Sequence, residues 1–142
     1  MKAKVKTIKQ KVTIPASPQE VYDAYTDPKK HSEFTESKAT GKPVVGGKFT
    51  AWDGYIFGKY LELDDGKRVV QEWTSTDFPK GYGPSRLELC FNKISEGTEL
   101  VMVQSNVPEE QADDTEQGWV EWYWDPLKKY FSEQSKGLMS LV

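Results

Sequence analysis

The chain has 142 residues, of which 37% are hydrophobic and 29% charged, and this predicts one soluble domain over residues 1–142 with a sizeable core. The net charge of -3 argues against a general nucleic-acid binder, which would carry a basic excess. No segment has the apolar length of a signal-peptide core or a membrane span, so we expect a cytoplasmic protein without a membrane-spanning segment.

The first predicted element is a strand over residues 5–14. Ile8, Val12 and Ile14 fall on one face of this segment, as the period of two in a half-buried strand requires. The same region carries the only local basic excess of the chain. Its charges are dispersed along the strand, which indicates a solvated strand surface rather than a binding site. They belong to Lys2, Lys4, Lys6, Lys9 and Lys11.

Two short helices are expected next. Ser17 is a suitable N-cap for the first helix, and Glu20 completes a capping box with it. The Asp-Pro pair at positions 27–28 ends this helix, because the residue before a proline is disfavoured in the helical region. A second short helix is expected over residues 28–34, although few apolar side chains support it.

The middle of the chain has the alternation and the turn signals of an antiparallel meander. The dipeptide Asp53-Gly54 is typical of a β-hairpin turn, and a second turn is expected at residues 64–67. A loop rich in proline and glycine is expected over residues 77–84. Strands are expected at residues 48–52, 55–63, 68–76, 86–94 and 98–106.

A long helix should follow the meander. Acidic residues between Glu109 and Glu116 crowd its start, where they favour the helix dipole; they form either a solvated helix start or a surface for a basic partner. Pro126 lies inside the helical pattern, so we expect a kink or a local break there. The apolar face of this helix consists of Trp119, Tyr123, Leu127, Tyr130 and Phe131. Trp122 and Trp124 lie off that face, which leaves one of them free to be exposed.

This order of elements predicts an α+β protein of the helix-grip type. It consists of one strand, two short helices, about six further strands and one long helix. The sheet has one face to bury, and the long helix is the only large apolar element left to cover it. We therefore expect a curved antiparallel sheet of about six to seven strands wrapped around the C-terminal helix.

The groove between this helix and the sheet is the candidate ligand site. Alternation places Gln71 and Gln104 on the inward face, and a mostly apolar cavity with a few polar groups is typical of a small-molecule site. The alternative is a closed core in which the two glutamines satisfy each other or bind water. The expected ligand-binding residues are Gln71, Trp73, Leu89, Met102 and Gln104 from the sheet, with Trp119, Tyr123 and Leu127 from the helix.

Side chains that could support catalysis are few. His31 is the single histidine and is expected to be an exposed surface residue. Cys90 is the single cysteine, so no intrachain disulfide can form, and its alternation with Leu89 and Phe91 turns it away from their side of the sheet. No Cys/His cluster has metal-ligand spacing, and no glycine-rich phosphate loop is present. We expect no catalytic residue, no metal and no cofactor.

Several segments, taken together and in order, resemble a known family. The opening motifs VTIPASP, EVY and YTDP resemble the START-like superfamily, also called SRPBCC. The later motifs resemble its branch named after the C-terminal domain of the activator of the ninety-kilodalton heat-shock protein ATPase. These are GGKF, GKYLEL, KRVVQEW, VPEE, a Gly-Trp pair at 118–119 and WYW at 122–124. The resemblance covers roughly residues 5–131 and implies a helix-grip fold with a cavity between helix and sheet.

Three functional hypotheses follow. The first is a non-catalytic module that binds a small hydrophobic or amphipathic ligand in the groove. The alternative, which the resemblance implies, is a protein-interaction module of the co-chaperone kind that contacts or stimulates a heat-shock chaperone in the stress response. An enzyme would need a buried carboxylate such as Glu62 or Glu72 as its base. The chain is expected to be a monomer or a homodimer.

Overall fold

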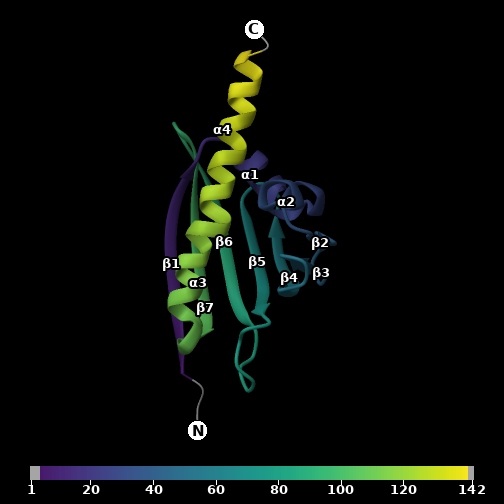
Figure 1. The fold of residues 1–142 in the computed structure, drawn as a ribbon, viewed down its shortest axis with the longest axis vertical. Coiled ribbons are helices and arrows are strands. Elements are labelled where there is room, and N and C mark those ends of the chain that lie inside the picture. The colour runs from purple at the N-terminus through teal and green to yellow at the C-terminus, as the bar shows by residue number, and fades with distance from the viewer. Residues whose placement is uncertain (1–3, 141–142) are drawn as a thin grey trace.

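A seven-stranded antiparallel sheet forms one layer of the molecule, and a long C-terminal helix crosses one of its faces (Figure 1). The computed structural model describes the backbone of residues 4–140 and the side chains of residues 4–133, so Lys2 of the basic run lies outside the described residues. The strands are β1 Val5–Ile14, β2 Thr40–Gly41, β3 Lys48–Ala51, β4 Ile56–Asp64, β5 Arg68–Ser75, β6 Ser85–Ile94 and β7 Gly97–Pro108. This is the predicted α+β helix-grip architecture.

The strand order β1-β7-β6-β5-β4-β3-β2 places the first strand beside the last one. β1 pairs with β7 from Val5 opposite Pro108 to Ile14 opposite Thr98. Because β1 and β2 lie at opposite edges of the sheet, the two helices between them carry the chain from one edge to the other. From β3 to β7, each strand pairs with the next in the sequence, as a meander requires.

The two connecting helices are α1 Pro18–Thr26 and α2 Pro28–Thr35. The predicted capping box is present, because Ser17 Oγ accepts from the backbone N–H of Glu20 and the Glu20 carboxylate accepts from the N–H of Ser17, both at 3.2 Å. Asp27 ends α1 and caps α2, where its carboxylate accepts from the backbone N–H of Lys29 at 3.0 Å. A strong local signal therefore fixes both helix starts.

The strands follow the predicted alternation closely in β6 and β7. Leu87, Leu89 and Phe91 are buried on the inner face of β6, and Cys90 between them is half-buried on the other face, as expected. The lysines that the structure describes at positions 4, 6, 9 and 11 are exposed, which confirms a solvated basic surface along β1.

The connection between β3 and β4 differs from the prediction. The Asp-Gly pair suggested a short turn, but the strands close at Ala51 opposite Ile56, so four residues form the loop. Trp52 and Asp53 both have positive φ, 53° and 56°, and neither continues a strand. Alternation alone could not find this arrangement, because Trp52 and Tyr55 have the β-propensity of strand residues. The two-residue strand β2 is too short to leave a sequence pattern.

The C-terminal helical segment is continuous but changes its winding three times. Its parts are the 3₁₀ turn η1 Glu109–Gln111, α3 Ala112–Trp119, the π-helical turn η2 Val120–Trp124 and α4 Asp125–Ser140. In the π turn, the N–H of Asp125 donates to the carbonyl of Val120, five residues earlier. A kink or a local break was expected at Pro126, but Pro126 is the second residue of α4 and the irregular turn lies just before it. α4 continues past the end of the sheet (Figure 1).

Candidate functional site

The middle of the expected groove is filled by side chains. Leu89, Met102 and Leu127 have no exposed surface, and each was expected to contact a ligand. They belong to one apolar cluster that also includes the inner aromatic residues of α1 and α2. Dense packing of this kind leaves no room for a ligand at the centre of the helix–sheet interface.

The two inward glutamines are satisfied by protein groups in this closed region, although not by each other. The Tyr25 hydroxyl donates to Gln71 Oε1 at 2.7 Å. Gln104 Oε1 accepts from the Trp119 indole N–H at 2.7 Å, and Gln104 Nε2 donates to Ser85 Oγ at 2.9 Å. The inward orientation was predicted correctly. The partners come from helices and other strands that the alternation of one strand cannot identify.

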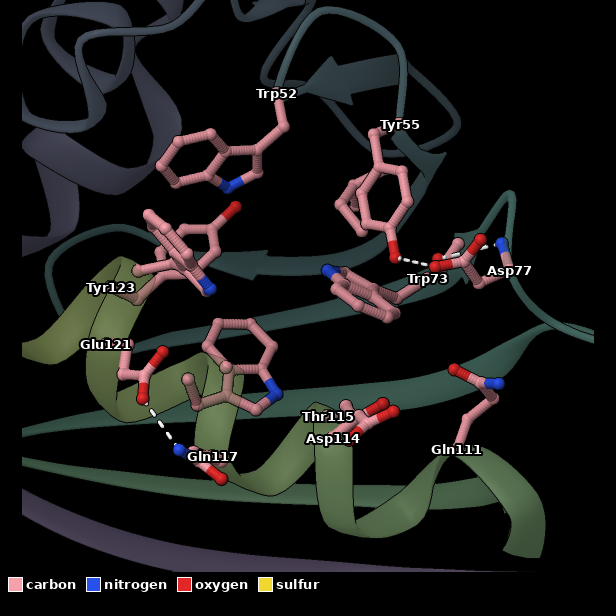
Figure 2. A pocket seen from close by; sticks show the side chains of 15 residues that line it. Trp52, Tyr55, Trp73, Asp77, Gln111, Asp114, Thr115, Gln117, Glu121 and Tyr123 are labelled. Atoms are coloured by element: carbon pink, nitrogen blue, oxygen red, sulfur yellow. Dashed lines mark hydrogen bonds between the residues drawn. The ribbon is translucent and has the colours of Figure 1, made fainter.

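The groove opens at one end into a cleft of about 640 Å³ (Figure 2). Its walls are α3 and the π turn on one side, and the β3–β4 loop with the ends of β4 and β5 on the other. Of the eight expected ligand-binding residues, Trp73, Trp119 and Tyr123 line this cleft. The other lining residues are Trp52, Tyr55, Ile56, Ser75, Asp77, Gln111, Asp114, Thr115, Gln117, Gly118, Glu121 and Trp122. The remaining five expected residues belong to the closed middle of the groove.

Aromatic rings in mutual contact form much of the wall. The Trp119 ring lies 4.6 Å from that of Tyr123 and 5.6 Å from that of Trp73, measured between centroids. The Trp52 ring stands steeply against its neighbours, at 73° to Trp122 and 81° to Tyr123. Trp122 is 55% exposed, which identifies it as the exposed tryptophan expected from the helix pattern. Rings at such angles pack edge-to-face, so this wall is an aromatic cluster with one exposed tryptophan.

The loop that holds Trp52 has an unusual backbone. A left-handed φ is uncommon for a bulky residue and costs about 1–2 kcal/mol. Two hydrogen bonds close the loop, from Gly54 N–H to the carbonyl of Ala51 and from Tyr55 N–H to the carbonyl of Trp52, both at 3.2 Å. Strain of this kind persists only where the surroundings hold it, and it is concentrated at functional sites. Here it places an indole ring at the mouth of the cleft.

The polar lining of the cleft is acidic. Asp77, Asp114 and Glu121 are exposed and line it, and none of the described lining residues is basic. The Tyr55 hydroxyl donates to Asp77, and Gln117 Nε2 donates to Glu121 at 2.7 Å. The ion pairs found among the described residues involve other carboxylates, so the negative charge of the cleft has no cationic partner in that part of the chain.

Trp73 presents an unsatisfied donor in this region. The side chain is 5% exposed, and its indole nitrogen is buried without a hydrogen-bond partner. Figure 2 shows this nitrogen on the side of the indole that faces Trp52 and Tyr123. Leaving a buried N–H without an acceptor costs about 1–3 kcal/mol. A molecule that supplied an acceptor there would recover part of this free energy.

His31 is buried, contrary to the expectation of a surface residue. Its exposed fraction is 6%, because α2 turns its inner face toward Tyr25 and Tyr123 while its charged neighbours in the sequence point outward. The Nδ1–H donates to the carbonyl of Tyr25 at 2.8 Å, and Nε2 accepts from the Tyr123 hydroxyl at 3.3 Å. Burial lowers the pKa of His31 to about 4, so the ring is neutral at physiological pH.

The side chains of the cleft are suited to recognition. They offer aromatic faces, amides, hydroxyls and carboxylates, which act by stacking, hydrogen bonding and charge. Burial raises the pKa of the Cys90 thiol, which disfavours the reactive thiolate. In the part of the chain that the structure describes, no three His, Cys, Asp or Glu side chains gather closely enough to hold a metal ion. Within the same residues, no helix has both the length and the apolar character needed to cross a membrane.

A comparison with protein families gives a match over residues 15–132 to the family described as "Activator of Hsp90 ATPase homolog 1-like protein". The chain belongs to this family. The resemblance inferred from the sequence motifs is therefore confirmed. The match begins at the end of β1 and continues into α4, so it includes both the closed groove and the cleft.

Two curated relatives of the family are named as activators of the 90 kDa heat shock protein ATPase. The protein from Dictyostelium discoideum is 32% identical over 136 residues, which are 95% of this chain and 35% of the relative. Homolog 1 from Homo sapiens is 32% identical over 121 residues, which are 85% of this chain and 36% of the relative. The chain thus spans about a third of the length of these relatives.

Solved structures share the fold. An HSP90 activator from Plasmodium falciparum has a TM-score of 0.79 at 20% identity, with 90% of this chain and 96% of that chain covered. The Aha1 dimer from Colwellia psychrerythraea has a TM-score of 0.73 at 19% identity, with 87% and 96% covered. At these identities the likeness shows that the helix-grip fold is common to all three chains.

Proposed function

We propose that this chain is a non-catalytic binding module that takes a small hydrophobic or amphipathic ligand in the cleft. The observation that carries the proposal is the contrast within one groove. Its middle is packed shut, while one end holds a space of about 640 Å³ bordered by aromatic rings. Small-molecule sites typically have volumes of about 300–1,000 Å³ and predominantly apolar walls with a few polar groups.

The position of the cleft also supports this function. Its walls come from two separate parts of the chain, the β3–β4 loop with the strands beside it and the helical segment from η1 to the π turn. The unsatisfied Trp73 N–H and the strained backbone of Trp52 both lie here. Features that lower stability without serving the fold are typical of binding sites.

Thermal unfolding in the presence of a panel of hydrophobic and amphipathic compounds tests the proposal. A ligand at about 100 times its Kd stabilises the fold by about 2.7 kcal/mol. For a domain of this size, the midpoint should rise by roughly 5 to 15 °C. The shift should saturate with ligand concentration.

A matched pair of variants then locates the site. Trp122→Ala removes an exposed ring that lines the cleft, and Phe57→Ala removes an exposed ring outside it. The first should abolish most of the ligand-induced shift and the second should leave it unchanged. Equal shifts in both variants, or no shift from any compound in a broad panel, would contradict a ligand site in the cleft.

Family membership favours a second candidate function, contact with an Hsp90-class chaperone. Relatives that are 32% identical to this chain are named as activators of that chaperone's ATPase, although they are about three times as long. The test is the ATP turnover of a purified Hsp90-class chaperone with increasing amounts of this chain. Stimulation that saturates would support the function. Turnover that stays unchanged up to a large excess of the chain would contradict it.

A further inference from the structure

The charge and the aromatic content of the cleft together indicate what kind of ligand it favours. Asp77 approaches it from the loop after β5, while Asp114 on α3 and Glu121 on the π turn belong to the helical wall, so both walls carry negative charge (Figure 2). The Lys and Arg side chains that form ion pairs in the described residues are engaged with carboxylates outside the cleft. An anionic ligand would therefore meet uncompensated negative charge at the mouth.

The steeply inclined rings add a second attraction for a cation. The negative face of an aromatic ring attracts an ammonium group within about 6 Å, and indole rings are the strongest in this respect. Trp52 packs edge-to-face against Trp122 and Tyr123, and Trp122 is 55% exposed, so an indole ring in this cluster is accessible to a ligand. Carboxylates at the rim and rings on the walls are the two groups that recognise organic cations in proteins.

Trp73 points to a further property of the ligand. Its buried indole N–H has no acceptor among the described residues, and it lies on the side of the ring that faces Trp52 and Tyr123 (Figure 2). An ammonium group cannot accept a hydrogen bond, so the acceptor must belong to another part of the same molecule. Because this nitrogen is buried, an acceptor can reach it only if a neighbouring side chain moves.

We propose that the ligand of this cleft is an amphipathic organic cation. It carries a quaternary or protonated amine at the acidic mouth, an apolar body against the rings, and a carbonyl or ether oxygen for the Trp73 N–H. This inference rests on the proposed function of the cleft and adds the chemical class of its ligand. The rim carboxylates are exposed, so they give the cleft a modest preference for positive charge that salt weakens.

Three probes that share a benzoyl group, two of them matched in shape, test the charge. Benzoylcholine has a phenyl ring, an ester carbonyl and a quaternary ammonium. Its carbon isostere, 3,3-dimethylbutyl benzoate, keeps the shape and the carbonyl but is neutral, and hippurate carries a carboxylate instead. Each is titrated into the ¹⁵N-labelled full chain at low ionic strength while the five tryptophan indole N–H resonances are followed. Trp→Phe variants assign these resonances.

Benzoylcholine should bind on the order of tenfold more tightly than its neutral isostere, and hippurate should bind most weakly. The Trp73 N–H resonance should shift with both benzoyl esters, since both supply the acceptor. The preference for the cation should shrink as salt is added, because the rim charges are screened.

Two double variants separate the role of the rim charge from a general change in net charge. Asp114→Asn with Glu121→Gln removes two charges that line the cleft, and the affinity for benzoylcholine should fall toward that of the isostere while the isostere's own affinity stays unchanged. Asp113→Asn with Glu116→Gln removes two exposed charges on the same helix that do not line the cleft, and it should leave the cation preference intact.

The outcomes distinguish this inference from the function on which it rests. If the isostere or hippurate moves the cleft resonances with an affinity equal to or above that of benzoylcholine, the cation class is wrong and the cleft remains a ligand site. If none of the three probes moves a cleft resonance, the cation inference is overturned. The compound panel with Trp122→Ala then decides whether the cleft binds another class or no ligand at all.

Discussion

The two regions of the groove share the same helix and the same sheet, yet they are built differently. In the closed region, side chains such as Leu89 and Leu127 are fully buried, and the polar atoms of Gln71 and Gln104 have protein partners. At the open end, the rings of Tyr55 and Trp122 are exposed and the backbone of Trp52 is strained. The buried Trp73 indole N–H there has no partner. The side chains that are tightly packed and hydrogen-bonded and those that are exposed or unsatisfied therefore lie in different segments of one interface.

The largest expected effect is in the closed region. Leu127→Ala should lower the free energy of unfolding by about 4 kcal/mol, because it opens a cavity at a site with no exposed surface. Urea denaturation measures this change. Val120→Ala, on the exposed side of the same helical segment, should cost less than about 1 kcal/mol. Similar values for the two variants would mean that the middle of the groove is not packed as described.

The second effect tests the histidine that connects the two regions. The pKa of His31 is about 4 in the folded chain against 6.5 for an ordinary histidine, so the unfolded chain takes up the proton first as pH falls. Stability present above about pH 6.5 should therefore be lost as pH falls toward 4, by roughly 3 kcal/mol. Urea denaturation of the native chain and of His31→Gln at several pH values isolates the contribution of His31 to this loss of stability. If the free energy of unfolding of His31→Gln fell as steeply with decreasing pH, the loss could not be attributed to the lowered pKa of His31.

The third effect compares two buried tryptophans. Trp119→Phe and Trp73→Phe remove the same atoms, but only the Trp119 indole N–H donates to a protein acceptor, the side-chain Oε1 of Gln104. The Trp119 variant should therefore be the less stable of the two by about 1–2 kcal/mol, since it leaves a buried acceptor unpaired. Chemical denaturation of both variants under one set of conditions gives the difference. If Trp73→Phe costs as much or more, Trp73 has a structural role that its missing partner does not reveal.

The smallest effect on stability belongs to the open end. Trp122→Ala should change the free energy of unfolding by about 1 kcal/mol or less, because the ring is 55% exposed and its described ring contact is with Trp52. The same variant should lose most of the ligand-induced shift of the unfolding midpoint. A large loss of stability with ligand binding retained would reverse the assignment of the two regions.

The sequence predicts the closed region well, because its signals are local and periodic. Alternation in β6 and β7 identified the inner faces, and the Ser17 capping box fixed the start of α1. The spacing of Trp119, Tyr123 and Leu127 identified the face of the helix that packs on the sheet. Each of these features depends on residues a few positions apart, so a single sequence carries the information.

The open end was largely missed, because it depends on contacts between distant segments. Trp52 and Tyr55 were assigned to strands, and only the positive φ of the loop turns them to the cleft. Asp77 and Asp114 are brought to the cleft by the tertiary fold rather than by a motif. His31 was misjudged for the same reason, since Tyr123, which contacts it, lies 92 positions further along the chain. Cleft residues of this kind leave no periodic signal to read.

The π-helical turn links the number of residues in the C-terminal helical segment to the directions in which its side chains point. Four residues overshoot one turn of an α-helix, which has about 3.6, so side chains spaced by four drift around the helix axis. The wider turn at Val120–Trp124 corrects that drift between Trp119 and Leu127. Regular α-helical hydrogen bonding over the same number of residues would rotate everything on one side of this turn by about 100° relative to the other side, because the extra residue would no longer be absorbed. A relative with the same number of residues and a regular α-helix here could keep the closed core or the aromatic wall, but not both in their present places.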